Sequence, residues 1–436
     1  MTRAVSTPAA IPQAAAREGE TRAAVRLLRL FLRAGVRLYL LVLATATRIG
    51  PRQRPAGGTP QDILLTLNFH AAGWPRALLA PLQRSPQCGR LRLVTSSPVD
   101  GLDGIDVIQA PAWLRRLCGA TLARLALFAW TAIRTRPEVV GGVHLLFNGL
   151  VATLAARICG ARALYICVGG PNEVAGGGLW SENRVFGRLT APDPVLERLL
   201  LRAATSCDTI VTMGTSAATY FNAHGARSCH VIPSGVDTHV FQPANQERDV
   251  DVLLVARLVP LKRIDLFVDT VARIAVTVPQ LTAIIIGRGP MLESARARVE
   301  TLGIGDRVSF LGHEPDVSTW YRRAKVFLLT SDTEGVSISL IEAMLSGAVP
   351  VVSDVGDLPD VVDDGDNGFL IEQREPVAFA GRVTALLTDP ELRARMSQRA
   401  RERALEFDPA ALAPRWGRLL AAGAAISNRE EALING

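Results

Sequence analysis

Residues 326–347, VFLLTSDTEGVSISLIEAMLSG, are the stretch from which the fold prediction starts. The apolar run at its beginning is typical of a strand buried on both faces of a parallel sheet. A polar loop with Glu334 and Gly335 follows, and a helix is expected over 339–345. Amide groups at the start of such a helix stabilise an anion, so the pattern indicates a diphosphate site. A capped helix with solvated acids is the alternative interpretation.

Two carboxylates and two cations extend this candidate site. Glu334 in the loop and Glu342 on the helix could bond hydroxyl groups on either side of a diphosphate. A second strand of the buried type, at 250–256, ends beside Arg257, and Lys262 follows five residues later. Because ligands bind at the carboxyl ends of parallel strands, both cations would meet a pyrophosphate there. Solvated loop cations are the alternative.

The same alternation of apolar runs and helix-length segments continues on both sides of this stretch. It predicts an α/β architecture with parallel sheets covered by helices on both faces. The polar segment 242–248, QPANQER, is interpreted as a linker between two domains, and 376–425 as helical. The expected strands are 62–68, 91–95, 139–147, 163–168, 209–212 and 229–232 before the linker, and 250–256, 282–286, 308–311, 326–329 and 349–353 after it.

A helix is also expected near the start of the chain, over residues 21–47. Its arginines recur every three or four residues and share one narrow sector, with apolar side chains over the rest of the surface. Such a helix suits a membrane interface with anionic headgroups, or it packs on the first domain with its charged edge solvated. Residues 112–136 have a similar composition and leave the same two interpretations. The stripe consists of Arg22, Arg26, Arg29, Arg33 and Arg37.

The composition of this 436-residue chain limits the classes of partner that we expect. The 48 Lys and Arg residues exceed the 41 Asp and Glu residues, and the net charge of +7 favours anionic partners. Nucleic acid is not expected, because interleaved aromatic and basic clusters are missing. The six cysteines are scattered without metal-ligand spacing, which favours a reducing compartment and no metal or other cofactor. No cleavable signal peptide is expected.

Two further motifs are weak by themselves. Residues 284–290, IIIGRGP, form a strand running into a glycine turn that many α/β proteins share. Asp249 and Asp251 have the spacing of an Asp-x-Asp metal motif, but they lead into a strand, so no metal site is expected there.

Taken in order, these motifs resemble the retaining, metal-independent transferases of glycosyltransferase family four. The resemblance is dense over 231–370: VIPSGVDTHVFQP at 231–243, ARLVPLKRIDLFVD at 256–269, IIIGRGP, and the run from 308 onward. It is looser over 136–171. The family has the GT-B fold, so the resemblance implies two Rossmann-like α/β domains with parallel sheets facing a central cleft.

The resemblance also implies a role for each site residue. Arg257 and Lys262 would hold the donor diphosphate, Glu334 would contact the transferred sugar, and Glu342 would bond the ribose. Many members have a His-Gly pair where this chain has Val168 before its glycines, so one sugar contact is missing. The other donor contacts would come from Gly335, Val336, Ser337, Ile338, Gly287, Gly312, His313 and Glu314, and from Gly169 and Gly170 in the first domain.

The predicted organisation therefore has five parts. Residues 1–20 would be disordered, 21–48 a basic amphipathic membrane-surface helix, 60–242 the acceptor domain, 249–408 the nucleotide-sugar domain, and 409–436 a C-terminal helix.

The resemblance implies a retaining glycosyltransferase. It would move a sugar from a UDP- or GDP-sugar to a glycan acceptor. The arginine-striped helix suggests that this acceptor is membrane-associated or lipid-linked, in polysaccharide or glycolipid biosynthesis. The expected place is cytoplasmic, peripheral on the inner face of the membrane. A nucleotide-sugar-binding scaffold and a sugar-nucleotide epimerase on the same fold are the alternatives.

Overall fold

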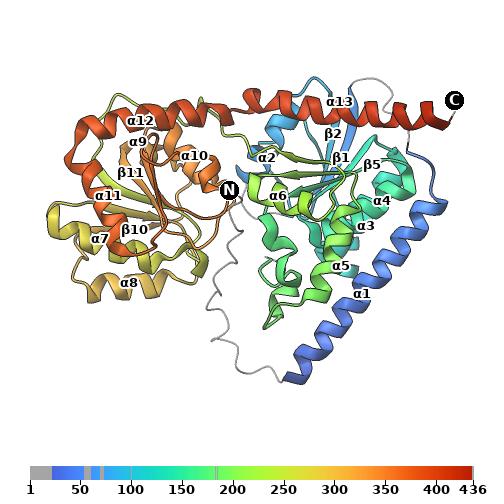
Figure 1. Ribbon diagram of the computed structural model, residues 1–436, viewed down its shortest axis with the longest axis horizontal. Coiled ribbons are helices and arrows are strands. Elements are labelled where there is room, and N and C mark those ends of the chain that lie inside the picture. The colour runs from blue at the N-terminus through green and yellow to red at the C-terminus, as the bar shows by residue number, and fades with distance from the viewer. Residues whose placement is uncertain are drawn as a thin grey trace. The chain divides into compact units, whose positions relative to one another are not determined.

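The computed structural model describes residues 22–53, 60–68, 73–99, 101–181, 183 and 185–434. The segment 1–20, expected to be disordered, lies outside them. The chain divides into two compact units. The C-terminal unit is Val236–Asp408, and the N-terminal unit combines the described residues up to Gly235 with those from Pro409 onward. Each unit is a parallel sheet with helices packed against it (Figure 1).

The N-terminal unit contains a seven-stranded sheet of order β3-β2-β1-β4-β5-β6-β7, in which every pair is parallel. Its central strands are almost wholly buried apolar runs, as a sheet covered on both faces requires. The strands are β1 (Gln61–Thr66), β2 (Cys88–Thr95), β3 (Asp106–Gln109), β4 (Val139–Val143), β5 (Arg162–Cys167), β6 (Thr209–Thr212) and β7 (Cys229–Val231).

Helices and short turns connect these strands. α3 and α4 lie side by side, and α13 packs beside α2, with Trp416 fully buried. The helices are α1 (Arg22–Ile49), α2 (Gly73–Gln83), α3 (Ala112–Thr135), α4 (Leu150–Cys159), α5 (Pro194–Thr205), α6 (Thr215–Ala223) and α13 (Pro409–Ile434). The turns are the π turn Leu145–Gly149 and the 3-10 turns Gly170–Glu173, Ala175–Gly177 and Phe186–Arg188.

The long helix α1 packs on α4 and α5 along one face (Figure 1). Leu32 and Val36 on this face are buried in the core of the unit. On the opposite face Phe31 is 73% exposed and Leu41 66% exposed. The apolar surface of the helix is therefore divided between a packed face and an exposed one.

The predicted arginine stripe runs between these two faces. Arg33 donates to both carboxylate oxygens of Asp193, at 2.9 to 3.2 Å, and Asp193 is fully buried at the start of α5. Arg29 donates to the Ala191 carbonyl at 2.8 Å. Arg26 and Arg37 are exposed. Half of these four arginines thus anchor the helix to its unit.

The C-terminal unit has a six-stranded parallel sheet of order β10-β9-β8-β11-β12-β13. Its strands are β8 (Val250–Val255), β9 (Ala283–Ile286), β10 (Val308–Gly312), β11 (Ala324–Leu329), β12 (Val349–Ser353) and β13 (Phe369–Ile371). Its helices are α7 (Ile264–Thr277), α8 (Leu292–Thr301), α9 (Ser318–Arg323), α10 (Ile338–Leu345), α11 (Pro376–Thr388) and α12 (Pro390–Ala404), with 3-10 turns at Pro260–Lys262, Leu358–Asp360 and Leu405–Phe407.

The boundary between the units lies before the predicted linker. Val236 donates from its amide to the Phe407 carbonyl at 2.9 Å, and Thr238 donates to Asp408 at 2.6 Å. Arg248, at the end of the expected linker, donates to the Ser346 carbonyl at 2.8 Å. The polar segment 242–248 therefore belongs to the C-terminal unit.

Other expected boundaries also change. β3 and β13 were not predicted, and the expected strand 139–147 ends at Val143, beyond which His144 and Phe147 have positive φ angles of 64° and 68°. The expected helical segment 376–425 consists of three helices, because new helices begin at Pro390 and Pro409.

Among the described residues, α3 alone is long and apolar enough to cross a membrane, judged by length and composition. Core helices pass the same test. The helix is interrupted at Gly119, and Phe128 and Ala132 in its second half are fully buried in the unit.

Candidate functional site

The candidate site lies where the strand order of the C-terminal sheet reverses. β8 is followed along the chain by β9 on one side, and β11 is its neighbour on the other. In open parallel sheets, ligands bind outside the carboxyl ends of the strands at such a switch point. Arg257 and Lys262 follow β8, and Glu334 follows β11. The topology therefore brings together the residues predicted as catalytic, which are far apart in the sequence.

Lys262 and Glu334 form an ion pair across this switch point. The Ser331 hydroxyl donates to the same carboxylate oxygen at 2.6 Å. The exposed fractions of the Lys262 and Glu334 side chains are 17% and 9%. A largely buried ion pair must recover a desolvation cost, and loss of one partner would leave the other charge uncompensated. Lys262 therefore holds the carboxylate that was expected to contact the sugar.

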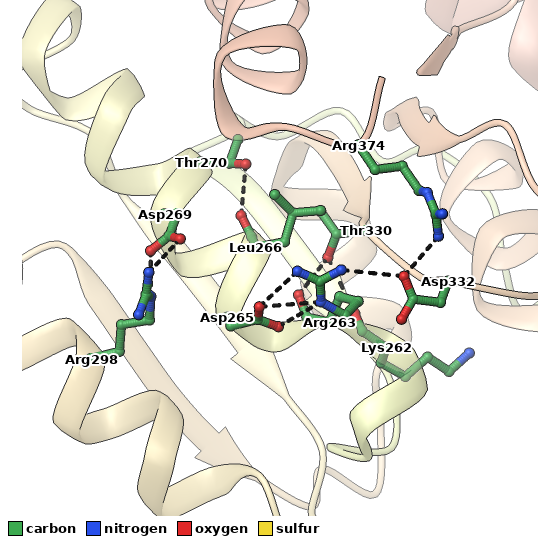
Figure 2. Close-up of polar contacts among 10 residues, drawn as sticks. All are labelled: Lys262, Arg263, Asp265, Leu266, Asp269, Thr270, Arg298, Thr330, Asp332 and Arg374. Atoms are coloured by element: carbon green, nitrogen blue, oxygen red, sulfur yellow. Dashed lines mark hydrogen bonds and ion pairs between the residues drawn. The ribbon is translucent and has the colours of Figure 1, made fainter. Parts of the chain in front are cut away.

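A second set of ion pairs fixes the loop after β8 (Figure 2). Arg263 contacts Asp265 at 2.9 Å and Asp332 at 3.3 Å, and Arg374 contacts Asp332 at 2.7 Å. The Thr330 hydroxyl donates to the Arg263 carbonyl at 3.0 Å. Figure 2 shows Lys262 pointing away from this group. These contacts thus tie the loop after β8 to the loop after β11. The Lys262 amine points away from them and contacts Glu334.

Two glycines allow backbones to approach closely around the site. A Cβ atom on Gly287, whose φ is +142°, would lie 1.8 Å from the Ala256 carbonyl oxygen. A Cβ atom on Gly356, at φ +58°, would lie 1.8 Å from the Glu334 carbonyl oxygen. A larger residue at either position would displace the loop that carries Arg257 or the loop that carries Glu334.

Glu342 lies in the second turn of α10, and its carboxylate accepts a hydrogen bond from the Tyr321 hydroxyl at 2.9 Å. Burial raises the pKa of Glu342 to about 7, although the Tyr321 hydrogen bond acts in the opposite direction. Tyr321 itself is fully buried, and burial raises the pKa of its hydroxyl. The carboxyl group is thus held in an environment that disfavours its charge, as at many ligand sites.

The start of α10 offers backbone amides beside Glu334. The helix begins at Ile338, after Ser337, whose hydroxyl contacts that of Ser339 at 3.0 Å and makes no capping bond to the helix. The first turn carries no acidic residue. Val336 and Gly335, also predicted to contact the donor, complete the short connection from Glu334. The positive end of the helix is therefore not neutralised by its own side chains.

The remaining predicted donor residues lie on neighbouring loops. Gly312 ends β10 at φ +74°, and its carbonyl accepts from the Gly287 amide at 2.7 Å. His313 is exposed and Glu314 partly exposed in the loop that follows. Arg257 is exposed just beyond β8. The C-terminal unit thus gathers these residues at one edge of its sheet.

Gly169 and Gly170 belong to the N-terminal unit, where Glu173 organises them. The fully buried Glu173 carboxylate accepts from the Gly169 amide at 2.7 Å and from the Tyr165 hydroxyl at 2.8 Å, and it contacts His144 at 2.9 Å. Burial raises the pKa of Glu173, but His144 and the backbone amides outweigh it, and the pKa is lowered overall.

The sequence did not single out Glu173 or Tyr321, because their partners come from distant positions. The aspartates of the Asp-x-Asp motif form ion pairs: Asp249 with Arg323 at 2.6 Å and Asp251 with Lys325 at 2.8 Å. In the part of the chain that the structure describes, no three His, Cys, Asp or Glu side chains are grouped as metal ligands.

Comparison with known proteins agrees with this geometry. Residues 236–403 match the family model of glycosyl transferases group 1. A D-inositol 3-phosphate glycosyltransferase of Streptomyces avermitilis is 27% identical, over 89% of this chain and 88% of the relative. One of Acidothermus cellulolyticus is 31% identical over 46% of this chain and 50% of the relative. The chain spans about half the length of several such relatives.

Among solved structures, HepE of Anabaena, in complex with UDP and glucose, superposes with a TM-score of 0.66 and 18% identity, covering 83% of this chain and 99% of that one. This likeness, together with the two parallel-sheet units, confirms the predicted GT-B fold. Over residues 236–403, the chain is thus similar to the group 1 glycosyl transferases.

Proposed function

We propose that this chain is a retaining glycosyltransferase that uses a nucleotide-diphosphate sugar without a metal. The observation that carries the proposal is the Lys262–Glu334 pair at the switch point of the sheet, with Glu334 three residues before the N-cap of α10, a helix whose own first turn carries no acidic residue. The similar HepE structure holds UDP and glucose, and the curated relatives are named glycosyltransferases, which supports the same class of donor.

The proposed chemistry follows from where charge develops. Breaking the anomeric bond leaves negative charge on the diphosphate and positive charge on the sugar. Arg257, Lys262 and the amides before α10 would stabilise the leaving diphosphate. Glu334 would bond the transferred sugar, and Glu342 the ribose. Retention would follow from attack on the same face that the leaving group departs, with a leaving phosphate oxygen taking the proton of the acceptor hydroxyl.

In the structure Glu334 already compensates the charge of Lys262. A donor phosphate arriving beside Lys262 would supply a second anion, and the carboxylate would then be free to bond the hydroxyl groups of the sugar. The ion pair would therefore stabilise both charged side chains until the donor binds. Fewer polar groups would then have to reorient during the reaction, which lowers its free-energy cost.

A panel of UDP- and GDP-sugars tests this function by thermal shift and nucleotide release. One donor should raise the melting temperature and be cleaved in the presence of acceptor, and Lys262→Met should abolish both responses. Arg273→Met, a change of charge on α7 away from the switch point, is the control. Stabilisation without transfer would support a nucleotide-sugar-binding scaffold, and conversion of the donor without acceptor would indicate an epimerase.

The exposed face of α1 supports a membrane-borne acceptor, such as a lipid-linked glycan, with the chain held at the cytoplasmic face of a membrane. Leu27, Leu30, Phe31, Leu38 and Leu41 are each 61–73% exposed. Full burial of one such side chain is worth roughly 1.5–3 kcal/mol. Exposed basic residues beside this face add about 1 kcal/mol each near anionic lipid.

Deleting α1 would not test this contact cleanly, because its inner face is part of the core. The triple variant Phe31→Ser, Leu38→Ser, Leu41→Ser instead changes only the exposed face. It should release the protein from vesicles containing anionic lipid while its melting temperature stays the same. Val276→Ser on α7, in the other unit, is the matched surface control, because it also removes an exposed apolar side chain (82% exposed). Unchanged vesicle binding of the triple variant would refute the membrane role of α1.

A further inference from the structure

One buried arginine of the N-terminal unit has no carboxylate partner. Arg124 on α3 is 1% exposed. Its guanidinium group donates to the Ser96 hydroxyl at 3.0 Å, to the Asn148 side-chain oxygen at 2.9 Å and to the Thr66 hydroxyl. All three acceptors are neutral, and no ion pair of Arg124 with a described residue is found. A buried charge is costly unless an opposite charge compensates it.

Arg124 lies at the ligand edge of its sheet. Thr66 ends β1, Ser96 follows β2, and Asn148 follows β4. The strand order reverses between β1 and β4, because β2 and β3 lie on one side and β5 to β7 on the other. The guanidinium group therefore occupies the switch point of the N-terminal sheet, where ligands of such sheets bind.

The start of α4 adds positive potential at the same place. Asn148 lies two residues before α4, whose N-cap residue is Gly149 and whose first turn carries no acidic residue. The helix dipole there is not neutralised by the helix's own side chains. A buried cation and the positive end of a helix thus converge, and no described carboxylate contacts Arg124. Glu173, which accepts from the Leu145 amide at the start of the π turn that contains Asn148, is paired with His144 instead.

Ser96 connects this charge to the surface. Its side chain is partly exposed, and its oxygen accepts from Arg124. The hydroxyl proton can then be donated outward, and the adjacent guanidinium group strengthens it as a donor.

We propose that this switch point binds a phosphate group of the acceptor, with Arg124 supplying the charge and Ser96 the direct contact. The inference rests on the proposed transferase function only in that the ligand is taken to be the acceptor. The phosphate site itself is independent of the donor site. It assigns an anionic, phosphorylated acceptor to the N-terminal unit.

Titration calorimetry with inorganic phosphate tests the site, in a background that carries Arg257→Met and Lys262→Met to disable the donor diphosphate site. This background should still bind phosphate. Arg124→Met should abolish the binding, and Ser96→Ala should weaken it about threefold to tenfold. Arg92→Met is the matched control: it removes an arginine of the same sheet whose charge Asp62 already balances at 3.2 Å, and binding should persist.

Thermal shift separates a ligand role from a structural one. At phosphate tenfold above its Kd, the background should melt about 3–5 °C higher than in chloride. Arg124→Met should lose this rise while melting in chloride at a similar or higher temperature, because a buried uncompensated charge is removed. An equal fall in both buffers would show that Arg124 only ties the three loops together and would overturn the proposal.

The source of the phosphate is distinguished by competition. Glycerol 3-phosphate represents a soluble phosphorylated acceptor, and a polyprenyl phosphate in detergent represents a lipid-linked one. Displacement of bound phosphate by either supports the site and names its source. If neither displaces it, or if the background binds no phosphate, the site is refuted, whereas loss of donor response alone would refute only the proposed function.

Discussion

The strongest test of the C-terminal site is the replacement of Glu342 by Gln. Burial raises the pKa of this carboxyl group from 4.5 to about 7. Between these values the unfolded chain loses its proton while the folded protein keeps it. Stability therefore falls as pH rises from about 4.5 to about 7 and stays lower above that range. Gln has nearly the same shape and no such penalty.

The size of the effect follows from the pKa. At about 1.4 kcal/mol per pH unit, the full difference would be roughly 3 kcal/mol. Some solvent reaches the side chain, so about 2–3 kcal/mol is the expected gain of Glu342→Gln over the native protein at pH 8. At pH 4.5 the gain should disappear, and the lost negative charge should weaken donor binding at pH 8.

Urea unfolding of both proteins at pH 4.5, 6 and 8 measures this difference, with a fluorescence signal assigned to the C-terminal unit through Trp320. Glu300→Gln, on the exposed surface of α8, controls for the loss of one charge. A difference between the native protein and Glu342→Gln that does not vary with pH would show that the carboxyl group is not held neutral by burial. A destabilised Glu342→Gln at pH 8 would contradict the reasoning outright.

Three further outcomes are expected. Gly287→Ala should destabilise the C-terminal unit by more than about 3 kcal/mol in urea unfolding, whereas Gly303→Ala, also at positive φ but with nothing within 4 Å of its Cβ position, should cost only about 1 kcal/mol; equal costs would refute the close approach. Glu173→Gln should lower stability by roughly 2–4 kcal/mol at pH 7, with a difference that shrinks below about pH 4.5, because the pKa of the native carboxyl is lowered; acid titration followed by circular dichroism would contradict this if the difference persisted. Asp193→Ala should cost about 3 kcal/mol, because it removes the cap of α5 and leaves Arg33 without its partner; unchanged hydrogen exchange in α1 would show that the ion pair does not hold that helix.

Much of the fold could be predicted because most strands and helices are specified by patterns within their own short segments of sequence. Strands such as β8 and β11 are continuous apolar runs followed by loops, and a buried parallel strand needs little else. β3 was missed because its four residues, DVIQ, are short and partly exposed. β13 has only three residues between polar turns. Neither carries a periodicity strong enough to be recognised.

The candidate site was predictable as a set of residues but not as a set of contacts. Lys262 and Glu334 were both expected at a diphosphate, yet their pairing joins positions 72 residues apart and follows only from the strand order. Arg124 belonged to a helix for which a solvated arginine face was one interpretation, and the structure buries it. Burial of a single charged side chain depends on which face of the helix meets the sheet, and the composition of the segment does not specify that face.

The return of α13 to the N-terminal unit has a consequence for synthesis on the ribosome. Trp416 and Leu420 complete the core beside α2, and the Leu420 carbonyl accepts from Gln61 on β1 at 3.1 Å. These residues are translated only after the whole of Val236–Asp408 has emerged. The N-terminal unit is therefore translated first but completed last. One apolar surface of its sheet stays uncovered while the C-terminal unit folds. A nascent chain stalled near residue 408 should accordingly have a folded C-terminal unit and an incomplete N-terminal unit. Chaperones would then bind near the start of the chain, at the uncovered apolar surface of the N-terminal unit.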